Sequence, residues 1–180
     1  IIGMLARLDQ AAVAAHGVGL RVQALAFVPG MSISQAVGAM VGNALGADRV
    51  GEARRVLWSG IVLCAAVMTP LGLVLIALAS PIVTLFGVAP GTPIHAHAID
   101  WMSLLGWSMP IVGVYIALTG LLQGAGDTRA SLKINTATTF VGQIPLSAIL
   151  GFTLGLGPWG VWAAFPLTFV AKLVWGGIEV

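Results

Sequence analysis

The residues best suited to acid–base or metal chemistry are His95, His97 and Asp100, which lie close together in the sequence. Imidazole and carboxylate groups are common ligands of zinc and other transition metals. Two histidines at positions i and i+2 point to different sides of a helix, although they could converge in a loop. We therefore interpret this stretch as a solvated loop-to-helix junction and predict no metal site.

The sequence does not contain the arrangement of residues expected for a catalytic centre. It has no P-loop that could hold nucleotide phosphates, and no serine, histidine and aspartate in a register that suggests a triad. The single cysteine, Cys64, lies in an apolar run and cannot form a disulfide within the chain. We predict that the protein is not an enzyme, has no catalytic residues and binds no cofactor.

A second group of polar residues lies inside long apolar runs. Polar groups are costly in lipid, so they tend to face the interior of a helical bundle or a water-filled cavity. They either form hydrogen bonds between helices or line the pathway of a substrate. The candidates for lining a substrate cavity are Gln23, Gln35, Asn43, Tyr115 and Gln143.

The composition indicates which elements must position these residues. Of the 180 residues, 58% are hydrophobic and only 8% are charged, and the mean hydropathy is +1.02. Soluble domains carry roughly 25% charged residues. A soluble chain of this size could not bury so much apolar surface, whereas a lipid bilayer solvates it. The net charge of +2 is not gathered in one patch and therefore does not indicate a nucleic-acid partner.

Five segments are apolar for the length of about 20 residues that a membrane-spanning helix requires. Residues 1–8 read as the end of a further, partial helix. The runs are too long for strands, and they lack the alternation of a membrane β-barrel. We predict an all-α integral membrane protein, with residues 1–180 forming a single transmembrane bundle. The predicted spans are about 20–45, 56–78, 98–123, 134–154 and 159–180.

The charges on the connections predict the orientation. Connections 46–55 and 124–133 are separated by two crossings and therefore face the same side. Positive residues favour the cytoplasmic side of a membrane, so we predict that both connections are cytoplasmic in a multi-pass protein of the cell membrane. The positive residues on these connections are Arg49, Arg54, Arg55, Arg129 and Lys133.

The two connections also resemble each other. One reads Gly46-Ala47-Asp48-Arg49, and the other reads Gly124-Ala125-Gly126-Asp127-Thr128-Arg129. Glycine can end a helix in a left-handed conformation, and aspartate can cap the helix that follows. We expect Asp48 and Asp127 to be such caps. The alternative is that these loops help to gate the cytoplasmic face.

No acidic residue lies deep in any complete span. Lys172 lies about 20 Å into the last helix, judged from the helical rise per residue, and we expect its side chain to extend to the cytoplasmic interface. A pump coupled to protons or sodium needs a titratable or ligating group at depth. The key carboxylate of such a pump would therefore lie outside this fragment.

Several short motifs are spread over nearly the whole chain. They are Arg21-Val22-Gln23-Ala24-Leu25, Pro29-Gly30, Val41-Gly42-Asn43-Ala44-Leu45-Gly46-Ala47, Glu52-Ala53-Arg54-Arg55, the run from Gly120 to Arg129, and Gly160-Val161-Trp162-Ala163-Ala164. Together these motifs resemble those of the multidrug and toxic compound extrusion (MATE) transporters.

This resemblance implies one half of a transporter with twelve helices in two six-helix bundles. Pro29-Gly30 and the Trp-rich last helix resemble the C-terminal bundle, so the partner would be the missing N-terminal half of the same chain. The implied activity is export of organic, often cationic compounds in exchange for H⁺ or Na⁺. Some members carry an acidic cation-site residue in the tenth helix. The region around Gly113 has none, which places the coupling site outside this fragment.

Two other functions remain open at this stage. One is a lipid-linked saccharide flippase of the same superfamily, for which more basic residues would be expected in the cavity. The other is a structural membrane subunit that transports nothing. A membrane-embedded enzyme would need convergent histidine or carboxylate groups at depth, which the spans lack.

Overall fold

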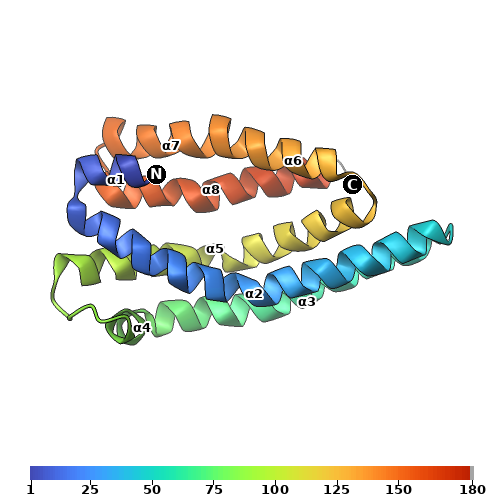
Figure 1. The fold of residues 1–180 in the computed structure, drawn as a ribbon, viewed down its shortest axis with the longest axis horizontal. Helices are drawn as coiled ribbons and strands as arrows, with labels where there is room; N and C mark the ends of the chain where they lie inside the picture. The colour runs from blue at the N-terminus through green and yellow to red at the C-terminus, as the bar shows by residue number, and fades with distance from the viewer. Residues whose placement is uncertain (179–180) are drawn as a thin grey trace.

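The computed structural model describes residues 1–178, which form a bundle of helices joined by short connections (Figure 1). Within these residues the chain has no strand, so the predicted all-α fold class is confirmed. The elements are α1 (Ile2–Leu8), α2 (Gln10–Gly46), α3 (Val50–Ala77), α4 (Ala79–Leu85), α5 (Pro93–Gly124), α6 (Thr128–Ala137), η1 (Thr138–Gln143), α7 (Ile144–Ala148), η2 (Ile149–Thr153) and α8 (Gly157–Ile178), where η marks a π-helical segment.

Four helices in the described residues, α2, α3, α5 and α8, are long and apolar enough to cross a membrane. The longest, α2, has 37 residues and begins at Gln10 rather than near Leu20. Its earlier start has a local cause, because the Asp9 carboxylate accepts a hydrogen bond from the backbone N–H of Ala11 at 2.8 Å. Such a cap satisfies one of the free N–H groups of the first helical turn.

The region predicted as a span over 134–154 is helical but segmented. It runs without a break from Thr128 to Thr153 through α6, η1, α7 and η2. Pro145 is the second residue of α7 and has no N–H to donate to the preceding turn, so a regular α-helix cannot continue through it. The π-helical segments lie on both sides of this short α-helix, and such segments often occur near functional sites.

The centre of the bundle is α5, which packs against α2, α3 and α8. In its most apolar window 56% of the residues are buried inside the protein, compared with 22% for α2. Glycine allows α2 and α5 to approach closely, since a Cβ atom on Gly120 would lie 2.4 Å from the Ser34 carbonyl oxygen. Small residues serve the same purpose at many contacts between membrane helices.

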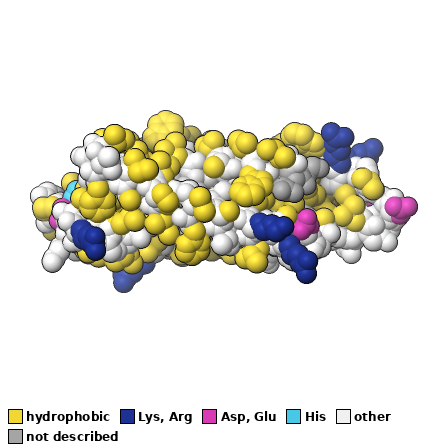
Figure 2. All heavy atoms as spheres, turned by 90° about the horizontal axis from the view of Figure 1, so that it is seen from above, with side chains coloured by type: hydrophobic (Ala, Val, Ile, Leu, Met, Phe, Trp, Pro, Cys, Tyr) yellow, Lys and Arg dark blue, Asp and Glu magenta, His cyan; other side chains and the backbone are white. Residues whose placement is uncertain are grey.

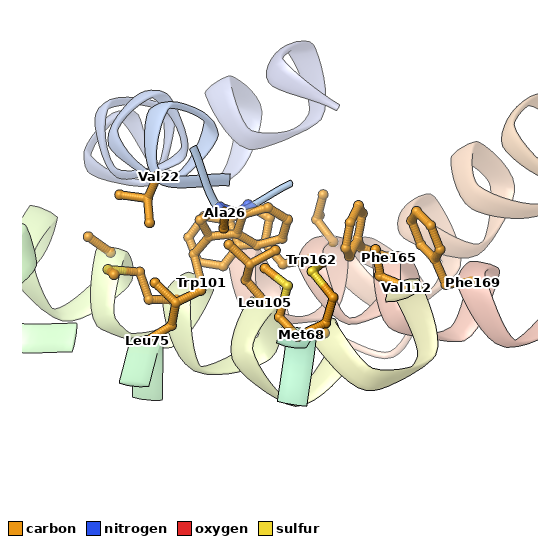
Figure 3. Packing of buried hydrophobic residues seen from close by; sticks show 14 of the residues in the cluster. Val22, Ala26, Met68, Leu75, Trp101, Leu105, Val112, Trp162, Phe165 and Phe169 are labelled. Atoms are coloured by element: carbon orange, nitrogen blue, oxygen red, sulfur yellow. The ribbon is translucent and has the colours of Figure 1, made fainter. Parts of the chain in front are cut away.

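A row of aromatic rings packs between α5 and α8 in the hydrophobic core (Figure 3). Trp101 lies edge-on to Phe165 with their centroids 5.5 Å apart, and Phe165 lies 4.8 Å from Phe169. Tyr115 continues the row at 5.7 Å from Phe169. Edge-to-face and tilted pairs at these separations are favourable, so the row holds α8 against α5.

The outside of the bundle is apolar, as the broad hydrophobic surface in Figure 2 shows. Large side chains such as Leu25, Val62, Trp107 and Val141 are at least 65% exposed. A patch of this extent would not be stable in water but is expected in contact with lipid. Together with the four candidate spans, this surface identifies a multi-pass membrane protein.

The turns after α2 and α5 differ in whether their aspartate caps the helix that follows. Asp127 caps α6, because its Oδ1 accepts from the backbone N–H of Ala130 at 2.9 Å. The expectation that Asp48 caps α3 is wrong, since the N-cap of α3 is Arg49 and no side chain bonds there. Asp48 instead adopts a left-handed backbone with φ of 58°, as Gly126 does with φ of 81°. Asp48 thus corresponds in conformation to Gly126 and not to Asp127.

Candidate functional site

A cavity of about 290 Å³ lies among α2, α5, α6 and α8. We call it the polar cavity because six of its residues have hydrogen-bonding side chains. It brings together two of the predicted residues, Gln35 and Tyr115. Its lining residues are Phe27, Met31, Ser34, Gln35, Tyr115, Ile116, Thr119, Gln123, Asn135 and Phe169.

Lys172 lies directly behind the wall of the polar cavity. Its side chain is buried, and its ammonium donates a hydrogen bond to Oδ1 of Asn135 at 3.2 Å. The ammonium also lies 4.8 Å from the ring centroid of Phe169 and 5.8 Å from that of Tyr115. Aromatic faces attract cations at these separations. The expectation that Lys172 extends to the membrane interface is therefore wrong, because it turns into the bundle.

Asn135 connects Lys172 to the backbone of α6. Its Nδ2 donates to the carbonyl oxygen of Ser131 at 3.0 Å while its Oδ1 accepts from Lys172. Both ends of the amide are thus engaged, which fixes its orientation at the cavity wall. On the α5 side, the Thr119 hydroxyl donates to the Tyr115 carbonyl at 2.9 Å and leaves its oxygen able to accept. The cavity offers neutral donors and acceptors, with one cation behind them.

The other predicted glutamines line a second cavity of about 210 Å³, which we call the tryptophan cavity. Gln23 and Gln143 lie there with His16, Trp101 and Trp162. Three buried nitrogen atoms at this place have no hydrogen-bond partner among the described residues: Nδ1 of His16 and both indole nitrogens. The three rings lie 5.3 to 6.4 Å apart by their centroids. The predicted cavity residues are therefore divided between two places.

Asn43 lines neither cavity and lies exposed near the end of α2. The predicted loop residues cluster at the two turns after α2 and α5, where Arg49 pairs with Glu52 at 2.8 Å on the surface. A surface ion pair of this kind adds little stability. The loop residues of the two turns are Gly46, Asp48, Arg49, Gly124, Gly126, Asp127 and Arg129.

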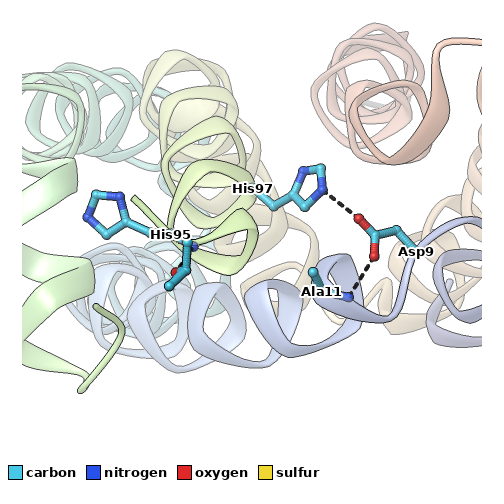
Figure 4. Close-up of polar contacts among 5 residues, drawn as sticks. Asp9, Ala11, His95 and His97 are labelled. Atoms are coloured by element: carbon cyan, nitrogen blue, oxygen red, sulfur yellow. Dashed lines mark hydrogen bonds and ion pairs between the residues drawn. The ribbon is translucent and has the colours of Figure 1, made fainter. Parts of the chain in front are cut away.

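The histidines at the start of α5 point to different partners (Figure 4). His95 is buried, with its Nε2 3.3 Å from the Ser80 hydroxyl, whereas Nε2 of His97 lies 2.9 Å from Oδ2 of Asp9. Hydrogen bonds from the Ala11 backbone and from His97 lower the pKa of the Asp9 carboxyl. Asp100 is exposed. Among residues 1–178, no group of three histidine, cysteine or acidic side chains is placed to hold a metal ion.

Sequence reasoning missed the residues that make the polar cavity distinctive, Lys172 and Asn135. One signal was available, because Lys172 is the only charged residue in the 22-residue α8. A charged side chain inside a membrane span marks a functional position by default. The distance of 37 positions between Asn135 and Lys172 left no local pattern that could pair them.

Comparisons with known proteins agree with this fold and these motifs. A probable multidrug resistance protein NorM from Deinococcus radiodurans is 29% identical over 98% of this chain. A second protein of that name, from Rhodopseudomonas palustris, is 32% identical over 91% of the chain. A FAD transporter from Shewanella oneidensis is 26% identical over 93% of it. The chain spans 39%, 36% and 36% of the lengths of these three proteins.

The three-dimensional fold matches solved structures of the same kind. The crystal structure of a MATE protein in its bent conformation superposes on 98% of this chain with a TM-score of 0.91, at 18% sequence identity, and the match covers 39% of that protein. The MatE family model matches residues 1–149, which is most of the sequence. The chain belongs to the multidrug and toxic compound extrusion (MATE) family.

Proposed function

We propose that this chain forms one half of a secondary active antiporter that exports organic compounds in exchange for H⁺ or Na⁺. The polar cavity is the observation that carries this proposal. Polar side chains inside a membrane bundle are costly unless they meet one another, water or a substrate. In a family of transporters, a cavity of this size lined by both polar and apolar side chains suits an amphipathic organic molecule.

The names of the relatives support export of organic compounds of more than one kind. Two are named multidrug resistance proteins and one is named a FAD transporter. Binding would occur in the cleft between this bundle and the rest of the transporter, and the bundles would move to open each side in turn. The chain itself acts as a carrier and not as an enzyme.

The coupling ion would bind outside this chain. None of the residues that line the polar cavity is acidic, and Asp100 lies exposed near the start of α5. Proton or sodium coupling at membrane depth normally uses a carboxylate. We therefore place that carboxylate in the other bundle, which would be the N-terminal one if this chain is the C-terminal bundle that Pro29-Gly30 and the Trp-rich last helix indicate.

The orientation follows from the charged turns. With the connections 46–55 and 124–133 facing the cytoplasm of the cell that makes the protein, the five positive side chains of these turns satisfy the positive-inside rule. The polar cavity then opens in the cytoplasmic half of the bundle, since Gln123 lies next to the end of α5. A substrate leaving the cytoplasm would meet it first.

Uptake into everted membrane vesicles tests the proposal. The full-length transporter should accumulate a fluorescent dye when a proton or sodium gradient directed out of the vesicle lumen is imposed, because the ion must leave as the dye enters. Gln35→Ala should lower the rate by roughly five- to tenfold, since losing one or two hydrogen bonds to a substrate costs about 1–1.5 kcal/mol. Ser32→Ala is the matched control, because the Ser32 hydroxyl bonds to its own helix on an exposed face. Accumulation that does not depend on either gradient would contradict the antiport proposal, and no accumulation at all would leave only a structural role for the chain.

A further inference from the structure

Lys172 is a buried cation that has no acidic partner among residues 1–178. The ion pairs found among residues 1–178 join Arg49 to Glu52 and Asp9 to His97, and neither includes Lys172. The ammonium has one hydrogen-bond acceptor, the neutral amide oxygen of Asn135. Burying a charge that is balanced only by a neutral group is unfavourable, so an anion close to this position would be strongly attracted.

The elements that pack against α8 supply no negative charge near Lys172. The segments η1, α7 and η2 contain no ionisable side chain, and α6 contributes only the exposed cations Arg129 and Lys133. On α5 the ionisable group near Lys172 is the Tyr115 hydroxyl. Asp100 is fifteen positions before Tyr115 and thus about 22 Å away along the helix. Among the described residues, the charged group in contact with this wall of the polar cavity is therefore the Lys172 ammonium.

The lining of the polar cavity combines two kinds of side chain. Four of its residues, Phe27, Met31, Ile116 and Phe169, are apolar. The other six carry hydroxyl and amide groups, which donate hydrogen bonds to oxygen atoms as readily as they accept them. A ligand with an apolar body and an oxygen-bearing head group would match both kinds of side chain.

We propose that Lys172 sets the charge preference of the polar cavity, which binds amphipathic organic anions by a carboxylate or phosphate group near Asn135. This inference rests on the proposed transport function and specifies its substrate class. It differs from the cationic substrates that the family resemblance implies. A unit charge a few ångströms behind the wall still acts on the ligand, because little water is present to screen it.

Two dyes that share a xanthene ring, carboxyfluorescein and rhodamine 123, provide the test in vesicles containing the full-length transporter. Lys172→Gln should lower the rate of anionic carboxyfluorescein uptake at least tenfold, and it should leave uptake of cationic rhodamine 123 unchanged or raised. Lys172→Arg should keep the anion preference. Lys133→Gln is the matched control on the exposed face of α6 and should change neither rate.

Asn135→Asp provides a second variant that keeps the size of the side chain. It places a carboxylate next to the Lys172 ammonium and should remove the anion preference without removing the lysine. A parallel assay of fluorescent phosphatidic acid redistribution separates the two sources of the anion. Redistribution that depends on Lys172 would assign the anionic group to a lipid head group, and uptake of carboxyfluorescein alone would assign it to a soluble compound.

The failures of the two proposals are distinguishable. A wild-type transporter that moves neither dye nor lipid under any gradient contradicts the transport function itself. A wild-type transporter that moves the dyes, with Lys172→Gln reducing both to the same extent, overturns only the charge preference and leaves Lys172 with a structural role. Unchanged carboxyfluorescein uptake in both Lys172→Gln and Asn135→Asp overturns it as well.

Discussion

Asp127 and Asp48 occupy similar turns, but their side chains have different effects on stability. The Asp127 carboxylate caps α6, whereas the Asp48 backbone ends α2 in the left-handed region. Asp127→Ala should therefore lower the free energy of unfolding in detergent by about 1 kcal/mol. Asp48→Gly should raise it or leave it unchanged, because glycine adopts a positive φ without steric cost.

Thermal unfolding of the two purified variants, followed by circular dichroism, measures this difference. The prediction requires opposite or clearly unequal shifts of the two melting temperatures. Equal losses of stability in both variants would show that Asp48 forms a side-chain cap in solution, contrary to the structure.

At the residue scale, contacts within a few positions along the chain could be predicted from the sequence, whereas contacts between distant residues could not. Asp127 was identified as a cap because capping depends only on neighbours within three positions. Asp48 was misassigned because the two turns were aligned by their letters, while the backbone aligns Asp48 with Gly126. The direction of Lys172 depends on a residue 37 positions away and could not be derived from local spacing.

Contact between α2 and α5 depends on positions where a side chain has no room. A Cβ atom on Gly120 would lie 2.4 Å from the Ser34 carbonyl oxygen, and both elements line the polar cavity at this level. Gly120→Ala should force the helices apart and lower the free energy of unfolding by about 1–3 kcal/mol. It should also reduce transport, because Thr119 and Ser34 would separate.

Gly17→Ala is the matched control in α2, because a Cβ atom there would meet nothing within 4 Å. It should stabilise the helix by roughly 0.5–1 kcal/mol, since alanine is the better helix former. Denaturant or thermal unfolding in detergent distinguishes the two variants. Similar effects of both substitutions would contradict the close approach of α2 and α5.

At the element scale, hydropathy located the long helices but not their irregularities. The predicted spans 56–78 and 98–123 end within one residue of α3 and α5 but start six and five residues after these helices begin. The apolar runs could be located because span length and composition are properties of the local sequence. The extension of α2 to Gln10 depends on a cap, and the π-helical turns beside Pro145 depend on packing against α8. The short helix α4 was missed because it lies in a stretch too short to span a membrane.

At the scale of the whole molecule, the bundle has an apolar outer surface and a polar cavity enclosed by four of its elements. The family and the all-α fold could be inferred from motifs distributed along the sequence. The twelve positions between Gln23 and Gln35 on α2 correspond to about 18 Å along the helix, so the two side chains lie at different levels of the bundle. Which residues of the other helices pack beside each of them, and hence which cavity each one lines, could not be inferred from the sequence.

The central claim is that the polar cavity is a water-accessible binding place for the transported compound. Cysteine labelling tests it directly in the full-length protein, with the buried Cys64 replaced by alanine. A membrane-impermeant maleimide reacts with thiolates in water and not with thiols in lipid. The reporter is Gln35→Cys in the polar cavity, and the control is Trp107→Cys on the outer surface of α5, where the native side chain is 70% exposed.

In everted vesicles, the Gln35→Cys variant should react with the maleimide, and a transported dye should slow that reaction. The Trp107→Cys variant should stay unlabelled with or without the dye. Labelling of Gln35→Cys that is no faster than that of Trp107→Cys, or that the dye does not change, would contradict the account.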